Sequence, residues 1–160
     1  MTPVETVQRR RLWRQVERIG RLEGQMRALP DHEFPEQMVA LRRRRRKGAD
    51  LSALVPEMYA LVREACRRAI GMRPYDVQVA GAIGLAQGHV IEMNTGEGKT
   101  FVAPMAACLY GLEQRGVHVL TANDYLAGRD AALLGPVYNM LGLKVGMVLA
   151  IEPMINEAGP

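Results

Sequence analysis

The sequence predicts an α/β protein in which a parallel sheet is preceded by an N-terminal helical arm. Before residue 88 the apolar residues recur at helical spacing. Beyond it, short β-branched runs alternate with helical patterns at 101–114 and 124–141. These runs begin at Val90, Val117 and Leu143. Strand, helix, strand, helix, strand in this order is typical of a parallel sheet with right-handed crossovers.

The first helix is predicted over residues 12–29. Apolar residues recur there at steps of three and four, Arg and Glu fill the positions between, and Pro30 ends the pattern. Gly20 and Gly24 each lower the intrinsic stability of this helix by about 1 kcal/mol relative to alanine, so the helix needs a surface to lie on. We favour the rest of the protein as that surface. An anionic membrane, which attracts basic amphipathic helices, is the alternative.

Three further helices are expected before the first strand. One covers residues 36–47 and ends in the run Arg42–Lys47, which we interpret as a solvated helix end. The next is strongly periodic over 58–70, and Pro56 suits its first position. The third is expected over 76–85.

The stretch Asn94–Thr100 has the layout of a phosphate-binding loop, in which a β-branched run leads into two glycines, a Lys-Thr pair and a helix. In such loops backbone N–H groups cradle the phosphates, the lysine reaches the β and γ oxygens, and the hydroxyl ligates Mg²⁺. Glycine permits the positive φ and the close backbone approach that these loops need. The residues in these roles are Gly96, Gly98, Lys99 and Thr100. Because Met93 replaces the first glycine of the general pattern, an ordinary glycine turn followed by a surface lysine is the alternative.

Gln78 precedes this loop by one helix and one strand. A glutamine one turn into a helix is usually exposed and inert. In this position, however, its amide can lie beside a bound base. Gln reads adenine with two hydrogen bonds, donating to N7 and accepting from the exocyclic amine.

The composition is that of an ordinary globular protein of 160 residues, with 48% hydrophobic residues, 24% charged residues and a net charge of +4. Cys66 and Cys108 fall in apolar helical patterns without a paired Cys or His at metal spacing. We therefore expect reduced core cysteines and a cytosolic protein. The longest charge-free apolar run, Phe101–Leu112, is too short to span a bilayer. No leader pattern opens the chain, so secretion is not expected.

Several separated blocks resemble the SecA family of preprotein translocase ATPases. The blocks are Leu54–Glu57, Val62–Ala65, Gly71–Gln78, Met93–Thr100, Gly116–Ala127 and Leu141–Gly146. Met93 agrees with the family at the position where it departs from the general loop pattern. The resemblance implies a partial RecA/helicase-like P-loop domain. Residues 71–160 are then the first part of a nucleotide-binding motor domain, and residues 1–70 are an N-terminal helical region with a basic amphipathic helix.

The resemblance also implies cofactors, partners and a location. ATP and Mg²⁺ are the implied cofactors, with Gln78 reading adenine and Thr100 ligating Mg²⁺. The implied phosphate-site residues are Thr95, Gly96, Glu97, Gly98, Lys99 and Thr100. Preprotein, a SecYEG-type channel and an anionic membrane surface are the implied partners, and nucleic acid is not expected. The protein would act in the cytoplasm, peripherally associated with the inner face of the plasma membrane, in a motor that couples ATP hydrolysis to protein translocation.

Hydrolysis by this chain alone is not expected. It needs an acid on Mg²⁺, a carboxylate that positions water and a cation for the transition state. No Asp-Glu pair follows an apolar run after Lys99, and Asp124 is the nearest imitation of a Walker B acid. The family's Walker B motif, preprotein-binding domain, second motor domain and arginine finger are expected beyond residue 160. No catalytic residue is therefore assigned.

Three other functions compete with this one. A compact P-loop kinase or GTPase would use Asp124 as its magnesium ligand, and needs the strand Val117–Thr121 directly beside the strand of the loop. A nucleic-acid-binding protein would place the arginine run on phosphates, but no aromatic residues are interleaved to stack on bases. A non-catalytic fragment would bind a membrane or a family partner through the same residues as the motor.

Overall fold

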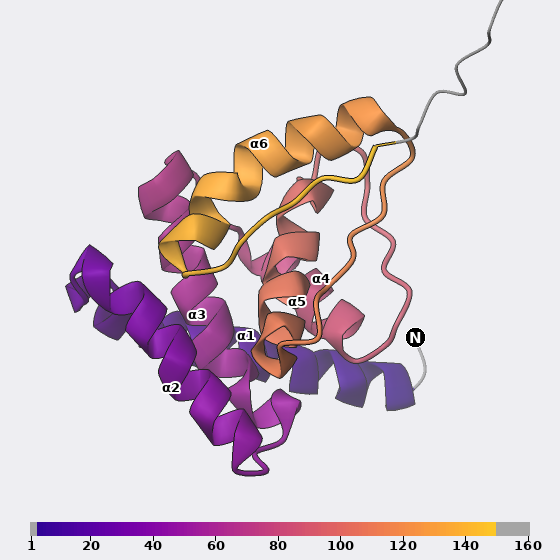
Figure 1. The fold of residues 1–160 in the computed structure, drawn as a ribbon. Coiled ribbons are helices and arrows are strands. Elements are labelled where there is room, and N and C mark those ends of the chain that lie inside the picture. Colours follow the sequence, from indigo (N-terminus) through magenta and orange to yellow (C-terminus); the bar gives the residue numbers. More distant parts are fainter. Residues whose placement is uncertain (1–2, 150–160) are drawn as a thin grey trace, which may run out of the picture.

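The structure is a computed structural model that describes residues 3–149, with side chains described from residue 9 onward. The last part of the expected motor domain, residues 150–160, lies outside the described residues. Short 3₁₀ turns occur at Asp31–Glu33, Lys99–Phe101 and Gly111–Glu113. The helices are α1 (Pro3–Ala28), α2 (Phe34–Arg46), α3 (Leu51–Ile70), α4 (Asp76–Ala86), α5 (Val102–Tyr110) and α6 (Asp124–Met140), as Figure 1 shows.

The predicted parallel sheet, and with it the α/β class, is wrong for the described residues, among which no strand is formed. The segments expected as strands run separately over the surface (Figure 1). Many of their apolar side chains face solvent, with Val90 98%, Leu120 90% and Val148 89% exposed, while Met93 and Leu143 pack partly against the core. A β-branched sequence favours a pleated, half-buried surface. It becomes a strand only where a neighbour about 4.8 Å away takes its backbone hydrogen bonds, and here these segments have no such neighbour among the described residues.

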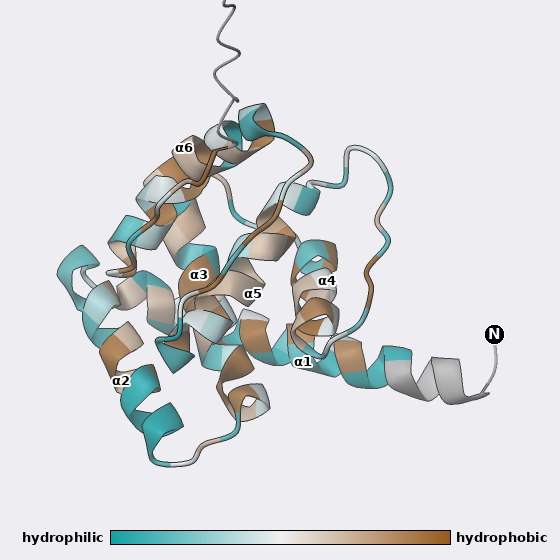
Figure 2. Cartoon of the chain, turned by 45° about the vertical axis from the view of Figure 1, so that its right-hand side comes forward, coloured by the Kyte–Doolittle hydropathy of each residue, from teal (hydrophilic) through white to brown (hydrophobic). Residues whose placement is uncertain are grey.

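Helix α3 is the centre of the fold. From Leu54 to Cys66 every residue except Glu57 is buried, and α1, α2, α5 and α6 all pack against this helix. A helix that is covered on all sides is hydrophobic around most of its circumference. Figure 2 shows the complementary pattern on α1 and α2, whose outward faces are hydrophilic.

The ends of the helices differ in detail from the prediction. Asp50 opens α3 by accepting a hydrogen bond from the N–H of Ser52 at 2.7 Å, so Pro56 lies inside the helix and not at its first position. Helix α5 ends at Tyr110 and continues as a 3₁₀ turn. Helix α6 covers most of the predicted 124–141 pattern and runs without interruption through Pro136.

Helix α1 lies on the protein itself, which is the surface that we favoured. Val16, Ile19 and Met26 on its inner face are buried in the common core, and α3 and α4 both contact it. At its end, Arg68 of α3 donates to the carbonyl oxygens of Met26, Arg27 and Leu29. These carbonyls have no partner within a helix, so the arginine completes the end of α1.

The arginine run at the end of α2 is attached to the protein, so the interpretation as a solvated helix end holds only in part. Arg44 pairs with Glu57 of α3 at 2.5 Å, and Arg45 pairs with Glu113 at 2.8 Å. Arg46 donates to the side-chain oxygen of Gln114. Arg44 and Arg46 are exposed. The run therefore holds α2 against its neighbours in the fold.

Cys66 and Cys108 are free and buried, as the sequence predicted. Burial raises the pKa of the Cys66 thiol to about 12 and also raises the pKa of Cys108. Both thiols are therefore protonated at neutral pH and act as core residues. Among the described residues, no helix combines the length and the apolar composition that crossing a bilayer requires.

Glu64 on α3 generates a prediction about pH. Its side chain is 4% exposed; hydrogen bonds from Arg67 lower its pKa, burial opposes that effect, and Arg68 adds to the lowering. A carboxylate with a lowered folded-state pKa stabilises the fold above its unfolded pKa and loses that contribution as pH falls below about 4. We expect Glu64→Gln to reduce the free energy of unfolding by about 1–3 kcal/mol at pH 7. At pH 3 the difference should shrink toward zero. Urea unfolding at both pH values measures it, and an equal difference at the two would contradict the assignment.

Candidate functional site

The glycine loop leads from the segment after α4 into α5. Gly96 and Gly98 have φ of +89° and +71°, the left-handed conformation for which the sequence argument required glycine. The chain then enters the 3₁₀ turn Lys99–Phe101 and continues as α5. The loop thus ends in a helical N-terminus, whose unpaired N–H groups favour a bound anion.

The polar groups of the loop are engaged with one another. The Glu97 carboxylate accepts from the backbone N–H of Asn94 at 2.8 Å and from its side-chain amide at 3.2 Å. The Lys99 ammonium donates to the carbonyl oxygen of Asn94 at 3.1 Å. Lys99 and Thr95 are exposed, whereas Thr100 is half-buried. An incoming phosphate would therefore replace the Asn94 carbonyl as the partner of Lys99.

Gln78 contacts the loop directly, although only 4% of it is exposed. Its side-chain oxygen accepts from the backbone N–H of Tyr75 at 2.8 Å, which fixes the first turn of α4. Its side-chain nitrogen donates to the carbonyl oxygen of Glu97 at 2.8 Å. A glutamine amide has two N–H donors and two acceptor lone pairs, and these two bonds use one of each.

Glycine at position 98 is required by this contact as well as by its φ. A Cβ atom there would lie 2.3 Å from the Gln78 side-chain nitrogen, closer than any real contact. The two sequence motifs, the glutamine and the glycine loop, are therefore fitted to each other.

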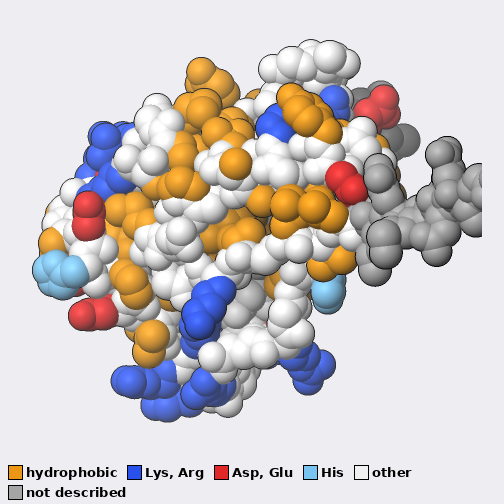
Figure 3. Space-filling model, turned by 45° about the horizontal axis from the view of Figure 1, so that its top comes forward, with side chains coloured by type: hydrophobic (Ala, Val, Ile, Leu, Met, Phe, Trp, Pro, Cys, Tyr) orange, Lys and Arg blue, Asp and Glu red, His pale blue; other side chains and the backbone are white. Residues whose placement is uncertain are grey.

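A large groove begins at the loop. Lys99 and Thr100 line one part of it, and the rest is formed by α5, α6 and the extended segments 116–123 and 143–148. Its volume is about 1630 Å³, and Figure 3 shows hydrophobic side chains gathered on the face where α6 and these segments lie. Gln78 is not part of its lining.

The loop offers one candidate ligand for Mg²⁺, the hydroxyl of Thr100. Among the described residues, no group of three or more His, Cys, Asp or Glu side chains is placed to hold a metal ion. Mg²⁺ commonly takes one or two protein ligands together with water and substrate phosphates. The Thr100 hydroxyl would be one such ligand, and the bound ion would neutralise phosphate charge.

Asp124 does not have the setting that the kinase or GTPase alternative needs. It is the first residue of α6, where Asn123 caps the helix by accepting from the N–H of Leu126 at 2.9 Å. The preceding segment Val117–Thr121 is not paired with the segment that leads into the loop, within the part of the chain that the structure describes.

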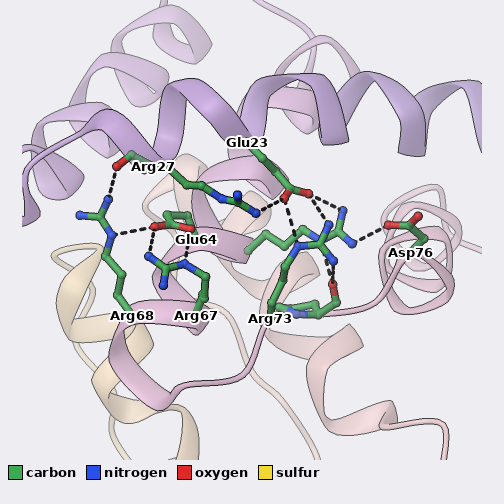
Figure 4. A network of polar contacts seen from close by, with 9 residues as sticks. Glu23, Arg27, Glu64, Arg67, Arg68, Arg73 and Asp76 are labelled. Atoms are coloured by element: carbon green, nitrogen blue, oxygen red, sulfur yellow. Dashed lines mark hydrogen bonds and ion pairs between the residues drawn. The ribbon is translucent and has the colours of Figure 1, made fainter.

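The sequence analysis missed a group of charged residues beside the start of α4 (Figure 4). Arg63 of α3, only 1% exposed, donates to the carbonyl oxygen of Pro74 at 2.7 Å and to Asp76 at 2.5 Å. Its third nitrogen lies 2.9 Å from Glu23 of α1, as an ion pair without the alignment of a hydrogen bond. Arg73 donates to the same Glu23 carboxylate at 3.0 and 2.5 Å. The available signal was an arginine in the middle of an apolar helical run, a position that is seldom exposed.

Comparison with known proteins agrees with the resemblance found in the sequence. A family model described as the SecA DEAD-like domain matches residues 2–156. The chain is 47% identical over 140 residues to protein translocase subunit SecA of Syntrophomonas wolfei, covering 88% of this chain and 17% of that protein. It is 49% identical over 140 residues to protein translocase subunit SecA of Carboxydothermus hydrogenoformans, covering 88% and 16%.

A plant relative is similar over a slightly shorter range. The chain is 49% identical over 130 residues to the chloroplastic protein translocase subunit SECA1 of Arabidopsis thaliana, covering 81% of this chain and 13% of that protein. The chain thus spans less than a fifth of the length of each of these relatives. On the match of the family model and on these identities, the chain belongs to the SecA family.

Proposed function

We propose that this chain is the ATP-binding segment of a SecA-type motor, which couples ATP hydrolysis to the translocation of preproteins across the bacterial plasma membrane through a SecYEG-type channel. The observation that carries the proposal is the 2.8 Å hydrogen bond from Gln78 to Glu97. It joins two separated motifs that are expected to bind the same nucleotide. Residues 71–160 would form the first part of the motor domain, and residues 1–70 its helical region.

In this proposal the phosphates of ATP lie between the glycine loop and the start of α5. Lys99, which is exposed, would exchange the Asn94 carbonyl for a phosphate oxygen, and a charge-assisted hydrogen bond to phosphate is the stronger of the two. The Thr100 hydroxyl would ligate Mg²⁺, and Thr95, Gly96, Glu97 and Gly98 would shape the backbone around the phosphates.

A peripheral position on the inner face of the plasma membrane is supported by the outward face of α1. Its inner apolar face is covered by the protein, so contact with a membrane would be electrostatic. Basic side chains near an anionic surface contribute about 1 kcal/mol each. The arginines on α1 that the structure shows exposed are Arg9, Arg10, Arg11, Arg14, Arg18, Arg21 and Arg27.

Replacing the loop lysine tests phosphate binding. We expect Lys99→Ala to weaken binding of Mg-ATP about tenfold to a hundredfold, because it removes a charged hydrogen bond worth about 1.5–3 kcal/mol. The matched control is Lys47→Ala, which removes an exposed lysine at the end of α2. Calorimetric titration measures both affinities. Equal affinity in parent, variant and control would exclude the loop as the phosphate site.

A second variant tests the choice of base. Gln78→Ala releases the loop from α4 and should weaken ATP and GTP alike through the loop. If Gln78 also reads adenine, the loss for ATP should exceed the loss for GTP by about tenfold, since a bidentate contact discriminates between bases by about 1–3 kcal/mol. Competition titrations with both nucleotides separate the two effects. Equal losses of ATP and GTP affinity would show that Gln78 supports the loop and does not read the base.

We also expect this chain to bind ATP with almost no turnover. Lys99, backbone donors and Thr100 supply part of the charge needed around the transferred phosphoryl group. An arginine supplied by a second domain is worth about 10³ to 10⁵ in rate in related enzymes, and no such arginine is assigned to this chain. Phosphate release at saturating ATP should be near background, and Asp124→Asn should leave it unchanged. Strong turnover that Asp124→Asn abolishes would instead support a compact kinase or GTPase.

A further inference from the structure

We propose that Arg63 is a positioning residue for the nucleotide site and that Glu23 connects its action to α1, so that the docking of α1 and the affinity for nucleotide are coupled. This inference rests on the proposed nucleotide binding. Neither residue belongs to the glycine loop.

The first step is the unusual position of Arg63. A guanidinium that is 1% exposed is costly to bury unless its charge and its N–H groups are matched. Here the carboxylates of Glu23 and Asp76 and the carbonyl oxygen of Pro74 surround it. Apolar side chains would serve as well for simple packing of α1 on α3. The arginine also fixes where α4 begins, because it bonds to Asp76, the first residue of α4, and to Pro74, two residues before it.

The second step runs from Arg63 to the loop. Pro74 and Asp76, which Arg63 holds, flank Tyr75, the N-cap residue of α4. The N–H of Tyr75 donates to the side chain of Gln78 at 2.8 Å, and Gln78 donates to Glu97 of the loop at 2.8 Å. The contacts of Arg63 with Pro74 and Asp76, of Tyr75 with Gln78 and of Gln78 with Glu97 are all hydrogen bonds, and peptide bonds join Pro74 and Asp76 to Tyr75. A shift of Pro74 and Asp76 would therefore move the Tyr75 N–H, which is the donor that holds the Gln78 side chain in place.

The third step brings in α1. The Glu23 carboxylate, whose side chain is 13% exposed, is shared by Arg63 and Arg73, with Arg27 beside it (Figure 4). Without Glu23, two guanidinium groups would compete for the single carboxylate of Asp76. Displacing α1 from α3 removes Glu23, and so it disturbs the support of α4. By reciprocity, a nucleotide that favours the ordered loop also favours the docked α1.

Three variants and one control test this coupling. Glu23→Gln and Arg63→Met remove links in the proposed chain, and Arg63→Lys keeps the charge without the directed fork of donors. The control is Glu57→Gln, which breaks the ion pair between α3 and Arg44 of α2 and removes no bond to α1, α4 or the loop. We expect ATP affinity to fall at least about fivefold in the three variants, with no change in the control at temperatures where all are folded.

A double-mutant cycle shows whether Arg63 acts through Gln78. In the Gln78→Ala background, Glu23→Gln and Arg63→Met should weaken ATP binding no further, because the link that they use is already absent. Losses that simply add, or an equal loss in the Glu57→Gln control, would overturn the proposal and leave Arg63 as a structural residue only.

A second readout needs no nucleotide. Hydrogen exchange of the Tyr75 amide, followed by NMR, reports the hydrogen bond to Gln78. We expect faster exchange at Tyr75 in Glu23→Gln, and in Arg63→Met if that variant folds, but not in Glu57→Gln. Faster exchange at Tyr75 supports the positioning role even if calorimetry detects no binding of ATP to the parent protein. A lack of ATP binding would overturn the proposed nucleotide site and not the positioning role. Unchanged exchange at Tyr75 in Glu23→Gln would overturn the positioning role.

Discussion

The burial of two adjacent charged residues in α3 is the constraint on which the other elements depend. Arg63 and Glu64 lie in the part of α3 that is mostly apolar and covered by neighbouring helices, and both are buried. Breaking a buried pair by removing one partner costs about 3–5 kcal/mol, so their partners must be present whenever the protein is folded. Arg63 is matched by α1 and α4, and Glu64 by Arg67 and Arg68 of α3 itself. Arg68 in turn holds the end of α1. The position of α1 is thus set by charge as well as by apolar contact.

The helices were predictable because their signals are local. Periodic apolar residues, the N-cap Asp50 and the terminal Gly71 with φ of +70° all act within a few residues of chain. The sheet was not predictable in the same way. The runs that begin at Val117 and Leu143 have strand composition, but pairing depends on a neighbour that composition does not identify. The partners of Arg45 and Arg46 lie 68 residues away in sequence, which is why a local reading expected a solvated helix end.

The candidate site shows the same division between local and distant information. The positive φ of Gly96 and Gly98 followed from the loop pattern alone. The sequence placed Gln78 near a bound base, whereas its strongest contacts in the structure are to Tyr75 and Glu97. Arg63 escaped the sequence analysis because a charged residue in a helix is ordinarily assigned to the solvent side. Its spacing from the apolar residues of α3 put it on a buried face.

The exposed extended segments have a consequence for how this chain behaves in concentrated solution. Residues 117–120 and 144–149 present valine, leucine and methionine side chains to water, next to backbone donors and acceptors that form no backbone hydrogen bond to another segment among the described residues. Such an edge is a template on which another chain can add by strand pairing. The colloidal stability of the protein therefore falls as its concentration rises, because two of these edges then meet more often.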